Sequence, residues 1–215
     1  MKRYNVRKLS GMTADLELES QTTDELPAGW NKADVLTNFT FPWEKRIAPP
    51  TEFRALWDET RFHFRFDCVD DDLVLPDGPT AKERVLAADR VEIFFAPDLS
   101  LKPYYCFEMS PRGDVLAYEG RFYREMNWGW QCDDLELTVH IEGNRYSVTG
   151  SIPLDTLRRL KVLRSRGMFV GIYRAEFHHR PDGTVHSGWM PWVNPRTEKP
   201  DFHVPASFGV LELVD

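Results

Sequence analysis

The sequence has few cysteines, no long apolar run and no excess of positive charge, and each of these absences excludes a class of protein. Three cysteines are an odd number and form no motif, so no disulfide framework is expected. No run of about eighteen apolar residues occurs, so the sequence predicts no membrane-spanning helix and no membrane partner. The net charge of -7 disfavours nucleic acid as a partner, because phosphate binding requires a basic surface.

Motifs for several chemistries are also missing. The sequence contains no Gly-Xaa-Ser-Xaa-Gly nucleophile motif. His178 and His179 are adjacent in a predicted strand, so they point to opposite faces and do not suit one metal ion. The first ten residues are basic but lack the apolar core of a signal peptide, which predicts a cytoplasmic protein or a secreted one without its leader.

Short strand patterns separated by turn residues fill most of the chain. With 42% hydrophobic and 13% aromatic residues, the chain can bury a large core. In the clearest pattern, Phe62, Phe64 and Phe66 alternate with polar residues, which predicts one buried and one wet face. The predicted strands are 51–58, 61–67, 90–96, 104–110, 114–119, 135–141, 146–152, 169–177, 185–190 and 208–213.

One short helix is predicted over 153–160, with Pro153 in its first turn and leucines along one side. Residues 30–50 are expected to wrap irregularly across one edge of a sheet. About ten antiparallel strands and one short helix predict a single all-β domain over 1–215. The expected architecture is an antiparallel β-sandwich of the immunoglobulin or jelly-roll kind.

Four charged residues interrupt strands that are otherwise apolar, namely Arg54, Glu92, Glu108 and Arg174. Because strand residues alternate between faces, each charge points away from its immediate apolar neighbours. Burying an unpaired charge costs several kcal/mol. We therefore expect either a buried ion-pair network or the polar floor of a binding groove.

Glu92 and Glu108 form a carboxylate pair with two interpretations. Glycoside hydrolysis uses two carboxylates at a fixed separation, one with a raised pKa. Alternatively, Arg54 or Arg174 neutralises each carboxylate, which makes the pair structural or ligand-holding. The available arginines favour the second interpretation, so we predict no catalytic residue and keep hydrolysis by the two glutamates as the alternative function.

Tryptophans in loops are candidates for stacking on sugar rings. Trp128 and Trp130 lie in the segment Met-Asn-Trp-Gly-Trp-Gln, and Trp189 and Trp192 flank Met-Pro shortly before Asn194. Exposed aromatic faces stack on the C–H faces of pyranose rings, while amide and charged groups hydrogen-bond the hydroxyls. The alternative for each tryptophan is a hydrophobic plug over the end of the sandwich.

An acidic turn is the one candidate for a metal site. Asp70, Asp71 and Asp72 follow Asp67 closely and offer the oxygen ligands that calcium prefers. Their spacing does not match an EF-hand, and a solvated turn is the alternative. Structural calcium is thus an open expectation, and no other metal or cofactor is predicted.

Seven segments, in order, resemble the family 9 carbohydrate-binding modules and related DOMON-type β-sandwich domains. The resemblance runs from about Trp30 to the C-terminus. The segments are Ala55–Asp71, Asp89–Phe95, Tyr104–Ser110 with Gly113, Tyr146–Pro153, Gly171–Ala175, Trp189–Pro191 and Asp201–Gly209.

The resemblance implies a non-catalytic β-sandwich that binds plant-type oligosaccharides or polysaccharides, such as xylan or cellulose fragments, and often holds structural calcium. Such modules are commonly attached to secreted glycoside hydrolases, which implies a hydrolase partner and a secreted or periplasmic location. Glu92 matches a sugar-contacting glutamate of the family. That role is carried over as an expectation.

The chain departs from the family at three positions. Family members clamp the sugar between two tryptophans, but Val85–Ala88 and Phe202 stand at the corresponding places. Glu108 replaces an expected arginine. The clamp is then either absent or rebuilt from Trp128, Trp130 or Trp192, and Phe202 is kept among the predicted sugar-binding residues.

Two further alternatives remain. Distantly similar sandwich domains hold haem between a methionine and a histidine, and Met109 or Met168 with His178 are available, although no spacing favours them. The chain could also be an accessory domain whose aromatic loops contact a partner protein.

Overall fold

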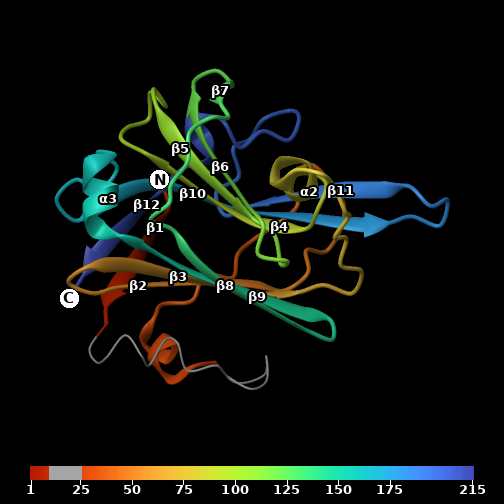
Figure 1. Cartoon of the computed structure of the whole chain (residues 1–215), viewed down its shortest axis with the longest axis horizontal. Coiled ribbons are helices and arrows are strands. Elements are labelled where there is room, and N and C mark those ends of the chain that lie inside the picture. The colour runs from red at the N-terminus through yellow and green to blue at the C-terminus, as the bar shows by residue number, and fades with distance from the viewer. Residues whose placement is uncertain (10–25) are drawn as a thin grey trace.

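The computed structural model describes residues 1–9 and 26–215. Within them, twelve strands form one sheet that curls on itself (Figure 1). The strands are β1 (Arg3–Lys8), β2 (Thr51–Trp57), β3 (Arg61–Val69), β4 (Arg90–Ala96), β5 (Tyr104–Met109), β6 (Val115–Arg121), β7 (Glu125–Asn127), β8 (Glu136–Glu142), β9 (Arg145–Pro153), β10 (Gly167–His179), β11 (Val185–Pro191) and β12 (Gly209–Val214).

The sheet has two halves that β1 joins. Its order is β7-β6-β5-β4-β10-β12-β1-β2-β3-β9-β8, with β11 paired to β10. β1 runs parallel to both β12 and β2, whereas the other strand pairs are antiparallel. The predicted all-β class and the ten predicted strands are confirmed. The predicted two-sheet sandwich is not confirmed, because β1 links the two halves into one sheet.

Four short helices complete the described chain. They are η1 (Ala28–Lys32), α2 (Ala81–Leu86), α3 (Leu154–Arg159) and η2 (Pro205–Ser207), where η denotes a 3-10 helix. The predicted helix after Pro153 is confirmed as α3. Helix α2 was not predicted from the sequence, although a capping box between Thr80 and Glu83 marks its start. None of the helices in residues 1–9 and 26–215 is long and apolar enough to cross a membrane.

The main core fills the space between the two halves. Phe62 of β3 and Phe95 of β4 meet there with ring centroids 6.0 Å apart, although their strands lie in different halves of the sheet. Phe64 and Phe66 join Phe62 in this core, as the alternation predicts. Their burial removes large aromatic surfaces from water and contributes much of the stability of the curled sheet.

The opposite face of β3 is less wet than predicted. His63 and Arg65 are only 5% and 8% exposed, so this face is largely covered too. Polar partners allow that burial: His63 Nε2 lies 2.7 Å from Asp58, and Arg65 Nη2 forms an ion pair with Asp67 at 2.6 Å. Alternation predicted the direction of the side chains, but not what covers them.

A second cluster, called the outer cluster here, lies on the face of β4, β5 and β10 away from the main core. Ile93 and Phe95 of β4 belong to the main core, whereas Phe94 between them belongs to the outer cluster. Tyr173 of β10 stacks on Phe202 at 4.0 Å within the outer cluster. Loops therefore cover this face and build a cavity against it.

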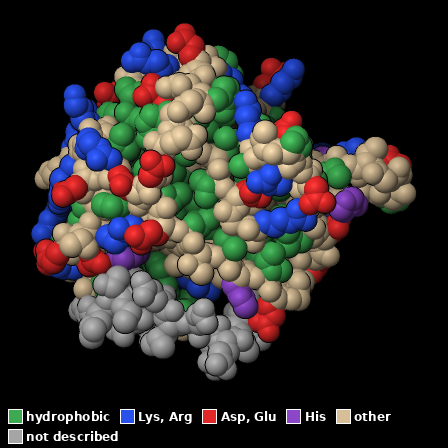
Figure 2. Space-filling model, in the orientation of Figure 1, with side chains coloured by type: hydrophobic (Ala, Val, Ile, Leu, Met, Phe, Trp, Pro, Cys, Tyr) green, Lys and Arg blue, Asp and Glu red, His purple; other side chains and the backbone are tan. Residues whose placement is uncertain are grey.

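The predicted wrap of residues 30–50 lies along β2. Leu36 forms an antiparallel bridge with Phe53, where β1 no longer pairs with β2. Trp30 is fully buried in a small cluster with Leu9, Ala33 and Leu56. Figure 2 shows hydrophobic side chains gathered near the middle of the viewed face, with acidic and basic groups intermixed around them. Neither sign of charge forms a continuous patch on that face.

Candidate functional site

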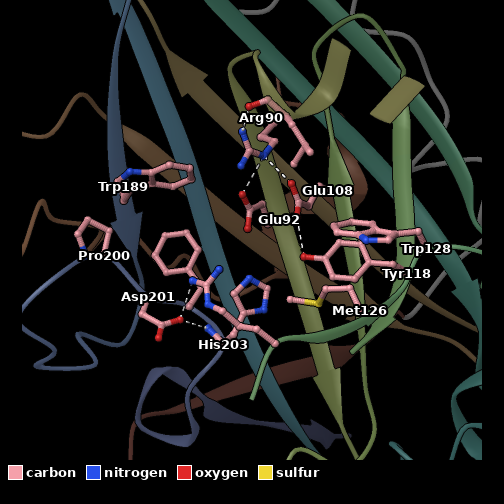
Figure 3. Close-up of a pocket in the computed structure, with 13 residues that line it drawn as sticks. Arg90, Glu92, Glu108, Tyr118, Met126, Trp128, Trp189, Pro200, Asp201 and His203 are labelled. Atoms are coloured by element: carbon pink, nitrogen blue, oxygen red, sulfur yellow. Dashed lines mark hydrogen bonds and ion pairs between the residues drawn. The ribbon is translucent and has the colours of Figure 1, made fainter. Parts of the chain in front are cut away.

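A cavity of about 530 Å³ lies over the outer face of β4 and β5 (Figure 3). We call it the Glu92 pocket. Its floor comes from β4 and β5, and its walls come from α2, β6, β7, β11 and the loops after β6, β7 and β11. The lining residues are Leu86, Arg90, Glu92, Glu108, Tyr118, Arg124, Met126, Trp128, Trp189, Pro200, Asp201, Phe202 and His203.

The floor carries two carboxylates and one guanidinium. Glu92 and Glu108 are direct cross-strand partners in β4 and β5. Arg90 lies two residues before Glu92, on the same face of β4. Its Nε lies 2.9 Å from Glu92 Oε1 and 2.7 Å from Glu108 Oε2. The three side chains are nearly closed off, with residue exposures of 2–3%.

The three floor groups are not equally satisfied. Arg90 Nε donates its hydrogen bond to Glu108, and the Tyr118 hydroxyl donates a second one to Glu108 Oε1 at 2.7 Å. Glu92 Oε1 receives none. Burial, and then the nearby charge of Glu108, raise the pKa of Glu92 to about 8. Glu92 is therefore mainly protonated at neutral pH.

Aromatic rings form the walls. Trp128 packs on Tyr118 with ring centroids 4.7 Å apart, and Trp189 meets Phe202 nearly edge-on at 5.8 Å. The Arg90 guanidinium lies 5.3 Å from the ring centroid of Trp189, within the range of a cation–π contact. The pocket thus combines apolar ring faces with a buried polar floor.

The loop after β11 supplies the remaining polar wall. Asp201 accepts hydrogen bonds from Arg124 Nη2, the Tyr123 hydroxyl and the backbone N–H of His203, at 2.7–2.9 Å. The Tyr104 hydroxyl lies 2.8 Å from His203 Nδ1. Burial lowers the pKa of His203 to about 3, so its imidazole is neutral at ordinary pH. The polar groups of this wall are therefore bonded to other groups of the protein.

A family model described as carbohydrate family 9 binding domain-like matches residues 23–215. The chain belongs to this family. A carbohydrate family 9 module of Caldicellulosiruptor kristjanssonii in complex with glucose has 14% identity and a TM-score of 0.57, covering 99% of this chain and 96% of that one. The same kind of module in complex with cellotriose has 15% identity and a TM-score of 0.57, with coverage of 99% and 93%.

A third solved structure shares the fold more fully. It is a Bacteroides uniformis protein, provisionally described as carbohydrate-binding, with 17% identity and a TM-score of 0.69 over 99% of both chains. No curated protein matches this chain. At such low identities, the structural neighbours show a shared fold, and the family model gives the family 9 membership.

Half of the predicted sugar-binding residues of this family 9 domain meet in the Glu92 pocket. They are Glu92, Glu108, Trp128, Trp189 and Phe202. The expectation that charges and neighbouring aromatics occupy opposite faces holds on both floor strands, because Ile93 and Phe107 face the main core. The contacts of these five residues with sugar stay a prediction.

The structure does not bring Arg54 or Arg174 to the pocket. Arg174 is fully buried on the main-core face of β10, where it donates to Asp70 and to the Thr51 hydroxyl at 2.9 and 2.8 Å. Its apolar neighbours, Tyr173 and Ala175, are the residues that face outward. Strand alternation places neighbouring side chains on opposite faces, but it does not show which face belongs to the core.

Arg54 lies in the other half of the sheet. It alternates with Phe53 and Ala55 of the main core and pairs with Glu52 at 2.7 Å and Asp67 at 3.2 Å. Neither Arg54 nor Arg174 neutralises the floor carboxylates, because Arg90 does so. A polar floor is therefore present, but its cation is Arg90 and not Arg54 or Arg174.

Three other predicted residues also lie outside the pocket. Trp130 packs against Tyr105 of the main core, with ring centroids 5.0 Å apart. Trp192 is 3% exposed and borders a different, more open hollow of about 390 Å³. Asn194 is exposed and accepts a hydrogen bond from the backbone N–H of Arg196 within its own turn. Only Trp128 and Trp189 of the four tryptophans predicted to stack on sugar line the pocket.

Sequence reasoning missed several lining residues. Arg90 could have been found, because it stands two residues before Glu92 and shares its strand face. The sequence alone could not identify Tyr118, Arg124 and His203 as lining residues. Their position depends on how β6 and the loops after β6 and β11 fold over the floor.

The acidic turn does not form a metal-ligand group. Asp70 pairs with Arg174, Asp71 accepts from Asn144, and Asp72 pairs with His179. Among the described residues, no three histidine, cysteine, aspartate or glutamate side chains are grouped to hold a metal ion. Calcium binding by this family 9 domain stays a prediction, and these residues do not fit it.

The methionines and the histidine considered for haem also lie apart. Met109 and Met168 are buried in the main core. His178 is partly exposed and contacts His186 and Arg46. The described structure therefore gives no support to haem binding by these three residues.

Proposed function

We propose that this family 9 domain binds an oligosaccharide or polysaccharide, without catalysis, in the Glu92 pocket. The observation that carries the proposal is the placement of two tryptophans around a buried polar floor inside a cavity of about 530 Å³. That volume lies within the usual range for small-molecule sites. The family membership and the sugar complexes of the structural neighbours support it.

The chemistry of the pocket suits a sugar ring. Trp128 and Trp189 offer apolar faces for the C–H groups of a pyranose. Glu92 provides an unused buried acceptor, and its protonated form also provides a donor. Hydroxyl groups, which donate and accept, match both properties. Binding should be modest, since an open site gains little beyond stacking and a few hydrogen bonds.

The finer assignment is a plant-type ligand such as a cellulose or xylan fragment. Cellotriose in a structural neighbour favours the cellulose-type ligand. A domain that holds such a chain would bring an associated glycoside hydrolase to its substrate. We therefore place cello-oligosaccharides first among the ligands to be tested, with xylo-oligosaccharides second.

Isothermal titration calorimetry with cellotriose and xylotriose tests this proposal. Wild-type protein should give saturable heat, and Trp128→Ala and Trp189→Ala should each weaken binding by up to about tenfold, since aromatic stacking contributes roughly 0.5–1.5 kcal/mol per ring. Ile141→Ala is the matched control, because Ile141 on β8 is exposed to 42% and Trp128 to 39%. Absence of heat in wild type, or equal affinity in all variants, would overturn the proposal.

Hydrolysis by Glu92 and Glu108 is the second candidate function. The raised pKa of Glu92 resembles that of a general acid, and Glu108, held by Arg90 and Tyr118, resembles a carboxylate base. Turnover of an aryl glycoside that Glu92→Gln or Glu108→Gln abolishes would establish it. The non-catalytic proposal predicts no turnover by either variant or by wild type.

A further inference from the structure

The Glu92 pocket contains one more carboxylate than guanidinium groups. Glu92, Glu108 and Asp201 line it together with Arg90 and Arg124, and its histidine, His203, is neutral. Asp201 is matched by Arg124 at 2.9 Å and by two further hydrogen bonds. The unmatched carboxylate therefore belongs to the floor pair, which shares Arg90 alone.

The geometry assigns the unmatched group to Glu92. The single Nε–H of Arg90 is directed to Glu108, which also accepts from Tyr118. Arg90 Nη1 points instead to backbone carbonyls, the nearest being Ala88 O at 3.3 Å. Glu92 Oε1 is consequently buried without a hydrogen bond, and its carboxylate borders the cavity (Figure 3).

We propose that the pocket prefers a sugar carrying a free amino group, and that the ammonium binds at Glu92 among the aromatic walls. This inference rests on the proposed function, because it names the ligand class of the same pocket. An ammonium donates up to three hydrogen bonds, and its charge pairs with Glu92 once that group has given up its proton. Charge-assisted hydrogen bonds are roughly twice as strong as neutral ones.

The aromatic walls add to this preference. A cation close to the face of a tryptophan or tyrosine ring is attracted by its π electrons, most strongly when water is excluded. The Lys82 ammonium already lies 3.6 Å from the centroid of the Trp128 ring, so this wall residue holds a cation in the free protein. A neutral sugar gains stacking from the same walls, but it brings no positive charge to pair with Glu92.

Binding of an ammonium should also change the protonation of the floor. In the free protein, Glu92 is mainly protonated at neutral pH. The charged or titratable groups that face it are Arg90 on its own strand, Cys106 and Glu108 on β5, Tyr118 on β6 and Tyr173 on β10. An adjacent ammonium favours the carboxylate, so Glu92 loses its proton to the buffer when the amino sugar binds. A neutral sugar releases no such proton.

Calorimetric titration with glucosamine, glucose, N-acetylglucosamine and cellotriose tests the inference. At pH 6.5 and low salt, glucosamine should bind about tenfold more tightly than glucose or N-acetylglucosamine, as one charge-assisted interaction implies. Titrations in buffers of different ionisation enthalpy should show proton release for glucosamine alone. N-acetylglucosamine is the matched ligand, because its nitrogen carries no charge.

Two variants test whether the preference for glucosamine depends on the Glu92 carboxylate or on a general effect of mutation. Glu92→Gln keeps the size of the side chain and should bring the glucosamine-to-glucose affinity ratio close to one, with no proton release. Glu136→Gln on β8 removes an exposed carboxylate and should leave the ratio unchanged. Thermal unfolding confirms that both variants are folded.

The outcomes distinguish this inference from the proposed function. Cellotriose binding with glucosamine no tighter than glucose would overturn the inference and leave oligosaccharide binding intact. A preference that Glu92→Gln fails to reduce would also overturn it. Absence of heat with all four ligands would overturn both.

Discussion

At the scale of single residues, Arg90 is the cation that allows two carboxylates to be buried in the floor of the Glu92 pocket. It is 3% exposed and lies within 2.9 Å of two carboxylates that are themselves almost fully buried. Removing the cation of such a cluster leaves a buried carboxylate without its partner, which is far more costly than never having had the pair. From the sequence, Arg54 or Arg174 was expected to neutralise the carboxylates, because the pattern of charges does not show which face each side chain occupies.

We therefore predict that Arg90→Met destabilises the fold by about 3–5 kcal/mol. Chemical denaturation of wild type and variant measures this difference. The triple variant Arg90→Met, Glu92→Gln, Glu108→Gln is the control and should recover much of the loss, since it removes the unpaired charges as well. A loss below about 1 kcal/mol in Arg90→Met would show that Arg90 does not neutralise the floor.

Glu92 should make stability fall as pH rises. Its pKa is about 8 in the folded protein and near its ordinary value of 4.5 in the unfolded chain, so the folded state binds the extra proton between these values. Stability contributed by the protonated group is complete below pH 4.5 and is lost progressively up to about pH 8. The free energy of unfolding of Glu92→Gln, measured from pH 5 to 8, should fall less steeply than that of wild type.

Asp89 provides an internal comparison for that measurement. Burial, and then the charge of Asp70, raise the pKa of Asp89 to about 8 as well, so some pH dependence should survive in Glu92→Gln. Identical pH profiles for wild type and Glu92→Gln would contradict the assignment of a raised pKa to Glu92.

At the scale of elements, strand periodicity predicted the fold well and the site only in part. The ten strands and α3 follow from local alternation and turn residues. β1 carries the same signal, with Tyr4 and Val6 buried between polar neighbours, but its basic residues concealed it. Period two also separates neighbours into opposite faces, yet it does not say which face is the core, and Arg174 was misplaced for that reason.

The loop after β7 carries two tryptophans whose positions strand periodicity does not predict. Trp128 packs on Tyr118 of the outer cluster, whereas Trp130 packs on Tyr105 of the main core. Trp128→Ala should therefore reduce sugar affinity and cost less than about 1 kcal/mol of stability. Trp130→Ala should cost about 2 kcal/mol of stability and leave affinity unchanged. Calorimetric titration and chemical denaturation of both variants measure these effects. A loss of affinity in Trp130→Ala, with a larger loss of stability in Trp128→Ala, would contradict the prediction.

At the scale of the whole molecule, the curled sheet separates stability from recognition. Its two halves enclose the main core, while the outer face of β4, β5 and β10 carries the pocket beneath loops (Figures 1 and 3). Residues far apart in the chain, from Leu86 to His203, meet only because the sheet brings their loops together. No local sequence pattern encodes that meeting, which is why half of the predicted site residues lie elsewhere.

The central claim is that sugar enters the Glu92 pocket, and the indole N–H signals of the tryptophans test it most directly. In a nitrogen–proton correlation spectrum titrated with cellotriose, the indole signals of Trp128 and Trp189 should shift and saturate together. Those of Trp130 and Trp192, outside the pocket, should stay in place. Saturable shifts of Trp192 without Trp128 and Trp189, or no shift of any indole, would contradict the account.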